Sequence, residues 1–174
     1  MPLPKISTPS YELELPSTGK KVKYRPFLVK EEKLLVLALE TESTKDISNA
    51  IKTVLKNCIQ SRGVKVENLP TFDIEYLFLN IRGKSVGEEV EVNLIAPDDE
   101  ETSVPVTINI DDIKISKKKG HTNKIKLDKS LVMEMKYPSL DEFVKNNFDF
   151  DGEVNMDQSF DLIASCIYKI YNEE

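Results

Sequence analysis

The fold depends on the stretch Pro70-Thr71-Phe72-Asp73-Ile74-Glu75-Tyr76-Leu77-Phe78-Leu79-Asn80-Ile81. Its β-branched and aromatic side chains would suit a strand. Pro70 at the start, acidic residues in the opening turn and Gly83 shortly after the end instead favour a helix. We therefore predict a helix that is buried on most sides, ends at Gly83, and contributes one shared face to the core: Phe72, Tyr76 and Leu79.

Two short alternating stretches precede this helix. Residues 11–15 and 22–24 each alternate apolar and polar side chains, and residues 16–19 between them are rich in turn formers. Such a pattern predicts a β-hairpin. Pro26 limits the second strand because proline has no backbone N–H to donate.

Two helices are predicted between the hairpin and residue 70. The first begins at Val29, with Glu31 and Glu32 in its first turn, where the helix dipole favours negative charge. The second follows Ser43-Thr44 and stops before Gly63. Its apolar residues recur every three or four positions and predict one stripe facing a core: Ile47, Ile51, Val54, Leu55, Cys58 and Ile59.

The pattern changes to strands after Gly87. Residues 90–94 and 104–110 alternate around an acidic turn, and Pro105 marks the second of these strands as an edge. Alternation resumes at Ile125 and continues to Tyr137, which predicts one small antiparallel sheet.

Helices are predicted again near the end of the chain. Ser139 can cap a short helix, and a last helix from Asp157 to Tyr171 would place its apolar side chains on one face. The predicted class is α+β. We expect a hairpin plus helices over residues 1–86, an antiparallel β-meander over 87–138, and an acidic helical segment over 139–174 that forms one compact domain with the first.

The composition excludes several classes of protein. The chain has 174 residues, 40% hydrophobic and 31% charged, which is ordinary for a globular protein. No apolar run approaches the roughly 20 residues needed to span a bilayer, and the first seven residues lack the features of a signal peptide. Two cysteines indicate free thiols in a reducing compartment. The net charge of −6 argues against nucleic acid as a partner.

Charge is segregated along the chain. Residues 88–112 hold nine acidic residues and no lysine or arginine, whereas residues 114–136 hold eight lysines and two acidic residues. Residues 141–174 hold nine acidic residues and two lysines. We favour solvated strands and loops, and the alternative is that blocks of opposite sign pair with each other or with a partner.

No pattern of catalytic or ligand-binding residues stands out. His121 is the only histidine and lies in a lysine-rich turn, where exposure is favoured over catalysis. Cys58 and Cys166 lack Cys-x-x-Cys spacing and fit apolar helix faces. The acidic residues 98–101 favour a solvated turn over a cation site, and Lys117–119 favour a solvated loop over a phosphate or RNA site. We predict no catalytic residues, no cofactor and no metal.

Two long blocks carry a resemblance to a known family. Residues 23–35 begin Lys23-Tyr24-Arg25-Pro26-Phe27, and residues 69–79 are followed by a shorter run at 82–88. Together with the first six residues, these blocks resemble baseplate hub proteins of T-even-type contractile-tailed bacteriophages. The likeness is close over the first 90 residues and looser through Ile113.

The resemblance implies a non-enzymatic protein that acts by docking to other baseplate hub or tail proteins. It would be made in the host cytoplasm, either remaining in the virion tail baseplate or leaving as a transient assembly chaperone. Homo- and hetero-oligomers both stay open. A remote alternative, a small hydrolase or nucleic-acid-binding module, would need a pocket around His121 or the lysine cluster.

Four adjacent residues are candidates for binding a partner: Tyr24, Arg25, Pro26 and Phe27. They combine two aromatic rings, a guanidinium and a rigid turn, and Tyr and Arg are enriched among interface hot spots. The alternative interpretation is structural, with Tyr24 and Phe27 fixing the hairpin to the first helix.

Overall fold

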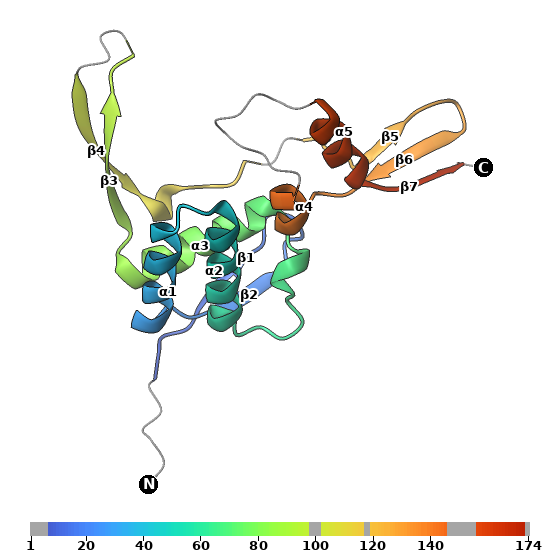
Figure 1. Cartoon of the computed structure of the whole chain (residues 1–174). Coiled ribbons are helices and arrows are strands. Elements are labelled where there is room, and N and C mark those ends of the chain that lie inside the picture. The colour runs from blue at the N-terminus through green and yellow to red at the C-terminus, as the bar shows by residue number, and fades with distance from the viewer. Residues whose placement is uncertain (1–6, 98–101, 117–118, 146–155, 173–174) are drawn as a thin grey trace.

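The computed structural model describes residues 7–97, 102–116, 119–145 and 156–172, and it confirms the α+β class (Figure 1). The described elements, in chain order, are β1 (Tyr11–Glu14), β2 (Lys21–Tyr24), α1 (Val29–Glu40), α2 (Thr44–Cys58), α3 (Thr71–Val86), β3 (Glu89–Ile95), β4 (Ser103–Asn109), β5 (Lys124–Lys126), β6 (Leu131–Met135), α4 (Leu140–Lys145), α5 (Met156–Ser165) and β7 (Ile167–Asn172). Short 3₁₀ turns lie at Val66–Asn68 and Ile110–Asp112.

The core lies between the β1–β2 hairpin and helices α2 and α3. The predicted hairpin and second helix are confirmed, and the Ser43 hydroxyl caps α2 by accepting the Asp46 N–H at 3.3 Å. Helix α2 ends at Cys58, in agreement with the prediction that it stops before Gly63. The buried apolar residues form one cluster: Leu13, Leu15, Val22, Tyr24, Val54, Leu55, Cys58, Val66, Ile74, Leu77 and Ile81.

Helix α3 forms as predicted but ends later. It continues through Gly83, which lies beneath the side chain of Ile110, and stops at Gly87, whose φ is 135°. Glycine adopts positive φ without the steric cost that a Cβ would bring, which is why the helix ends there and not at Gly83.

The core face of α3 also differs from the prediction. Ile74, Leu77 and Ile81 are buried, whereas the three residues assigned to the core are only half-buried: Phe72, Tyr76 and Leu79. With Pro16 and Ile115 they line an apolar groove of about 420 Å³. The three residues do share a helix face, but α3 has apolar residues on all sides, so its sequence gives no sign of which face the hairpin covers.

A buried carboxylate joins α3 to the hairpin turn. Asp73 is fully buried and accepts the backbone N–H of Ser17 at 2.9 Å and the Ser17 hydroxyl. Because Ser17 lies in the turn between β1 and β2, these bonds fix the hairpin on the first turn of α3.

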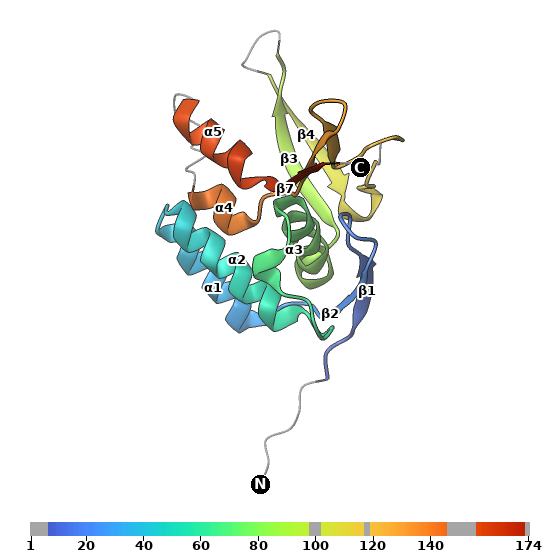
Figure 2. The same cartoon turned by 90° about the vertical axis from the view of Figure 1, so that its right-hand side faces the viewer.

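The predicted single sheet over residues 87–138 is wrong. Strands β3 and β4 form a two-stranded hairpin, whereas β5, β6 and β7 form a separate sheet in that order. Figures 1 and 2 show the β3–β4 hairpin projecting away from the helices. The division of the chain into domains at residues 86/87 and 138/139 stays a prediction.

The predicted last helix is half wrong. Helix α5 ends at Ser165. Residues 167–171, expected to be helical, instead lie in β7, which pairs with β6 on the side opposite β5. Ile167-Tyr168-Lys169-Ile170-Tyr171 has the β-branched and aromatic content of a strand. Pairing with β6, where Tyr171 lies opposite the buried Val132, outweighs the helical period.

The short helix α4 begins as predicted. The Ser139 hydroxyl accepts the Glu142 N–H at 3.3 Å, and the Glu142 carboxylate accepts the Ser139 N–H at 2.8 Å, a reciprocal capping box. Lys52, which is buried on α2, forms an ion pair with Asp141, so α4 is held against α2.

Truncating one leucine on each of two faces of α3 should show which face lies in the core and which lines the groove. Leu77→Ala should lower the free energy of unfolding by about 2–5 kcal/mol because Leu77 is completely buried. Leu79→Ala, on the half-buried face, should cost less than half as much. Urea denaturation measures both, and equal losses would contradict the assignment of faces.

Removing the buried carboxylate should loosen the hairpin. Asp73→Ala leaves the Ser17 N–H and hydroxyl without their charged acceptor, which should cost about 1.5–3 kcal/mol in unfolding free energy. Glu75→Ala removes an exposed carboxylate from the same helix turn and is expected to change stability by less than about 0.5 kcal/mol. Thermal or urea melts that rank the two variants the other way would refute this role for Asp73.

Candidate docking surface

The predicted partner-binding residues lie where β2 meets α1. Tyr24 is 2% exposed, and its ring stacks on that of Tyr11 with centroids 5.8 Å apart. The Arg25 N–H donates to the Cys58 carbonyl at 3.0 Å, which joins this segment to the end of α2. The Tyr24 side chain therefore belongs to the core.

Arg25 is held by a buried carboxylate. Its guanidinium donates to the Pro26 carbonyl at 2.8 Å and lies 3.3 Å from Glu31 Oε1. Glu31 is 2% exposed and also accepts the Leu28 N–H at 2.8 Å, which caps the start of α1. Burial raises the pKa of Glu31, but the Leu28 N–H and Arg25 outweigh it, so the pKa is lowered overall.

Phe27 links the same junction to α3. Its backbone N–H donates to the Ser85 hydroxyl at 3.0 Å, and its side chain packs against the core cluster. The alternative interpretation, in which Tyr24 and Phe27 have a structural role, requires contacts of this kind. Direct binding of a partner by residues 24–27 stays a prediction.

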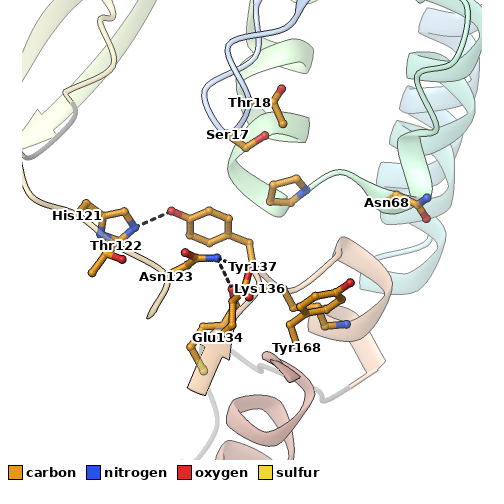
Figure 3. A pocket seen from close by; sticks show the side chains of 12 residues that line it. Ser17, Thr18, Asn68, His121, Thr122, Asn123, Glu134, Lys136, Tyr137 and Tyr168 are labelled. Atoms are coloured by element: carbon orange, nitrogen blue, oxygen red, sulfur yellow. Dashed lines mark hydrogen bonds between the residues drawn. The ribbon is translucent and has the colours of Figure 1, made fainter. Parts of the chain in front are cut away.

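His121 lines an open cleft between the hairpin turn at Ser17 and the β5–β6–β7 sheet (Figure 3). The cleft measures about 650 Å³. The His121 Nε2 lies 2.8 Å from the Tyr137 hydroxyl, and the Tyr137 ring meets Phe72 edge-on at 4.8 Å. A concave site around His121, which the enzymatic alternative needs, is therefore present.

The polar groups of this cleft are paired in a way that stabilises the sheet. Glu134 accepts from Asn123 Nδ2 at 3.3 Å and lies 3.2 Å from Lys169 Nζ. Within the described ranges, the hydrogen bond recorded for the His121 ring goes to Tyr137 and not to a carboxylate. A histidine that acts as a general base is usually oriented by such a carboxylate.

The two cysteines are not placed together. Cys58 is buried, which raises the pKa of its thiol to about 11, and Cys166 follows α5 and is half-buried. Among the described residues no group of three or more His, Cys, Asp or Glu side chains is arranged for a metal, and no helix is long and apolar enough to cross a membrane. The acidic turn 98–101 and Lys117 and Lys118 lie outside the described residues.

The feature that sequence reasoning missed is the exposed apolar face of the β3–β4 hairpin. Leu94, Val104 and Ile108 lie on one face of the two strands and are 54%, 49% and 41% exposed. The alternation was visible in the sequence, but it does not tell whether another element covers this face. In the structure, β3 and β4 pair only with each other among the described strands.

The hairpin is anchored at its base. Lys84 of α3 lies 2.7 Å from the Glu88 carboxylate and 3.0 Å from that of Asp111, which flank the two strands. These two carboxylates raise the pKa of Lys84, Glu88 contributing more. Ile110 is buried just beyond β4. The hairpin is therefore fixed at one end and exposed along the rest of its length.

Helix α1 adds a second exposed apolar surface. Glu31 is its only buried residue, whereas most of its aliphatic side chains are exposed: Val29, Leu34, Val36, Leu37 and Leu39. Exposed apolar patches of this kind, on a protein with an intact core, commonly mark protein–protein contacts.

Comparison with known proteins supports this interpretation. Residues 8–174 match the family described as T4 bacteriophage base plate protein. The chain belongs to this family. No curated protein and no solved structure gives a significant match. Membership in the T4 base plate family indicates a structural protein of the phage tail baseplate that interacts with other baseplate or tail proteins.

The acid sensitivity of this base plate protein should depend on Glu31. Because its pKa is lower in the folded state, Glu31 stabilises the fold above the ordinary glutamate value of 4.5, and that contribution is lost as pH falls through the folded pKa. Glu31→Gln should therefore lower unfolding free energy by about 1–3 kcal/mol at neutral pH and by much less at pH 3.

The matched control is Glu32→Gln, which removes an exposed carboxylate from the same turn of α1. Urea denaturation of the three proteins at both pH values measures the difference. A Glu31→Gln deficit that does not shrink at low pH would contradict the ionic role.

Proposed function

We propose that this base plate protein is a non-enzymatic subunit of the baseplate hub that acts by docking to another hub or tail protein during tail assembly. The observation that carries the proposal is the projecting β3–β4 hairpin with its exposed apolar face. The resemblance of residues 23–35 and 69–88 to hub proteins supports the hub in particular.

The exposed apolar face is unfavourable in water, and covering it with a partner lowers the free energy. A two-stranded hairpin is marginally stable in water by itself. Burying Leu94, Val104 and Ile108 against a partner would remove apolar area from water, at about 25 cal/mol for each Å². The excess of acidic residues disfavours nucleic acid and anionic membrane surfaces as partners.

Co-expression with hub and tape-measure proteins of the same T4-type phage tests the proposal. We expect co-elution with one of them on size exclusion, through an interface that buries at least about 1,000 Å² in total. Elution as a monomer beside every tail component would contradict docking.

Two substitutions on the apolar face should weaken that complex. Leu94→Thr with Val104→Thr keeps β-forming side chains but removes apolar contact area. We expect binding at least about tenfold weaker, because one buried aliphatic side chain contributes about 1.5–3 kcal/mol. Ser103→Thr, on the opposite face of β4, is the control and should bind like the parent chain. Titration calorimetry measures all three.

Mass spectrometry separates a permanent subunit from an assembly chaperone. A permanent subunit should occur both on hub intermediates in the host cytoplasm and in finished tails. A chaperone should occur only on the intermediates. Absence from both would remove the hub role altogether.

A further inference from the structure

The two outer edges of the β3–β4 hairpin can be assigned from its hydrogen bonds. The Ile110 N–H donates to the Glu88 carbonyl at 2.8 Å, and the Ala96 N–H donates to the Thr102 carbonyl at 2.9 Å. Bonded and non-bonded pairs alternate in an antiparallel ladder, so the bonded pairs between these ends are Val90 with Ile108, Val92 with Val106, and Leu94 with Val104.

The alternate residues on β3 therefore direct their backbone groups away from β4. These are Glu89, Glu91, Asn93 and Ile95. All four are exposed, and within the described ranges no backbone hydrogen bond from another element reaches them. Their N–H and C=O groups make an uninterrupted edge that another strand can pair with.

The outer edge of β4 differs at one position. Pro105 lies opposite Asn93, in a non-bonded pair, so its missing N–H costs the hairpin nothing. The same proline interrupts the row of donors on the outer edge of β4. Of the two edges, only that of β3 offers a complete row, and an added strand is expected there.

The charged side chains beside the β3 edge indicate which kind of strand can bind there. Glu89 and Glu91 point to one face, and Val90 and Val92 point to the other. Neither glutamate forms an ion pair within the described ranges, in contrast to Glu88, which pairs with Lys84. Residues 88–112 contain no lysine or arginine that could neutralise them.

We propose that the β3 edge binds an extended segment of the hub partner as an added β-strand, and that this segment alternates lysine or arginine with apolar residues. The basic side chains would face Glu89 and Glu91, and the apolar ones would extend the face of Val90 and Val92. Main-chain bonds supply affinity in such strand addition, and the alternating side chains supply specificity. The inference rests on the proposed function and names the chemistry of its partner.

A matched pair of proline substitutions tests the edge. Glu91→Pro removes an outward N–H from β3, and Thr107→Pro removes one from β4; neither donor takes part in the hairpin ladder. The partner is the tail protein that co-elutes with the parent chain. We expect Glu91→Pro to weaken the complex by about tenfold or more, as loss of an edge bond and steric exclusion of the strand imply, whereas Thr107→Pro binds like the parent chain.

Charge and backbone protection provide independent readouts. Glu91→Gln should weaken binding about two- to fivefold and reduce its salt dependence, whereas Asp112→Asn, an acidic residue beyond β4, should do neither. Hydrogen exchange should show the Glu91 and Asn93 amides protected in the complex and not in the free protein, a result that does not depend on any variant folding.

The outcomes separate this inference from the proposed function. If the complex forms but the β3 amides stay unprotected, or both proline variants bind alike, the strand-addition proposal is overturned and hub docking stands. If the parent chain forms no complex with any tail protein, both fall together.

Discussion

The buried carboxylate of Asp73 is the contact on which the arrangement of the N-terminal half depends. It accepts two bonds from Ser17, so the turn of the β1–β2 hairpin is fixed to the first turn of α3. That contact decides which face of α3 is covered: Leu77 and Ile81 enter the core, and the opposite face is left as an apolar groove. A second buried carboxylate, Glu31, fixes the start of α1 through Arg25 and Leu28 in the same way. Buried charges survive in an apolar interior only when such partners satisfy them.

The elements that share this core hold the β3–β4 hairpin at its base but do not cover it. Lys84 near the end of α3 binds Glu88 and Asp111, on either side of β3 and β4, so the hairpin leaves the body in a defined direction. Beyond that anchor its apolar face is exposed, and its other face carries Glu89 and Glu91. The outer edge of β3 has a full row of backbone N–H donors, whereas Pro105 interrupts the row on β4. Exposed apolar surface of this kind commonly marks a contact with another protein. It fits a member of the base plate family, whose subunits interact with other baseplate or tail proteins.

The polar side chains of the His121 cleft are paired with each other, whereas among the described residues the two glutamates of β3 are not paired. In the cleft, His121 with Tyr137 and Glu134 with Lys169 are mutually paired and join β5, β6 and β7 to the loop before them. Glu89 and Glu91 on the hairpin have no such pairing in the described part of the chain, and the apolar residues beside them are exposed. Groups without partners in the isolated chain are where association can lower the free energy most.

Local sequence patterns determined the β1–β2 hairpin, α2, the existence of α3, the capping box of α4 and the alternation of β3 and β4, since each depends on neighbours a few residues apart. No catalytic motif stood out among them, and the resemblance of two blocks indicated the family. Only the tertiary structure decided which face of α3 is buried, that Gly83 lies inside the helix under Ile110, and that residues 167–172 pair with β6 as a strand. It also decided that the apolar face of β3–β4 stays exposed. Each of these depends on contacts between residues far apart in the chain, which local propensity and periodicity do not contain.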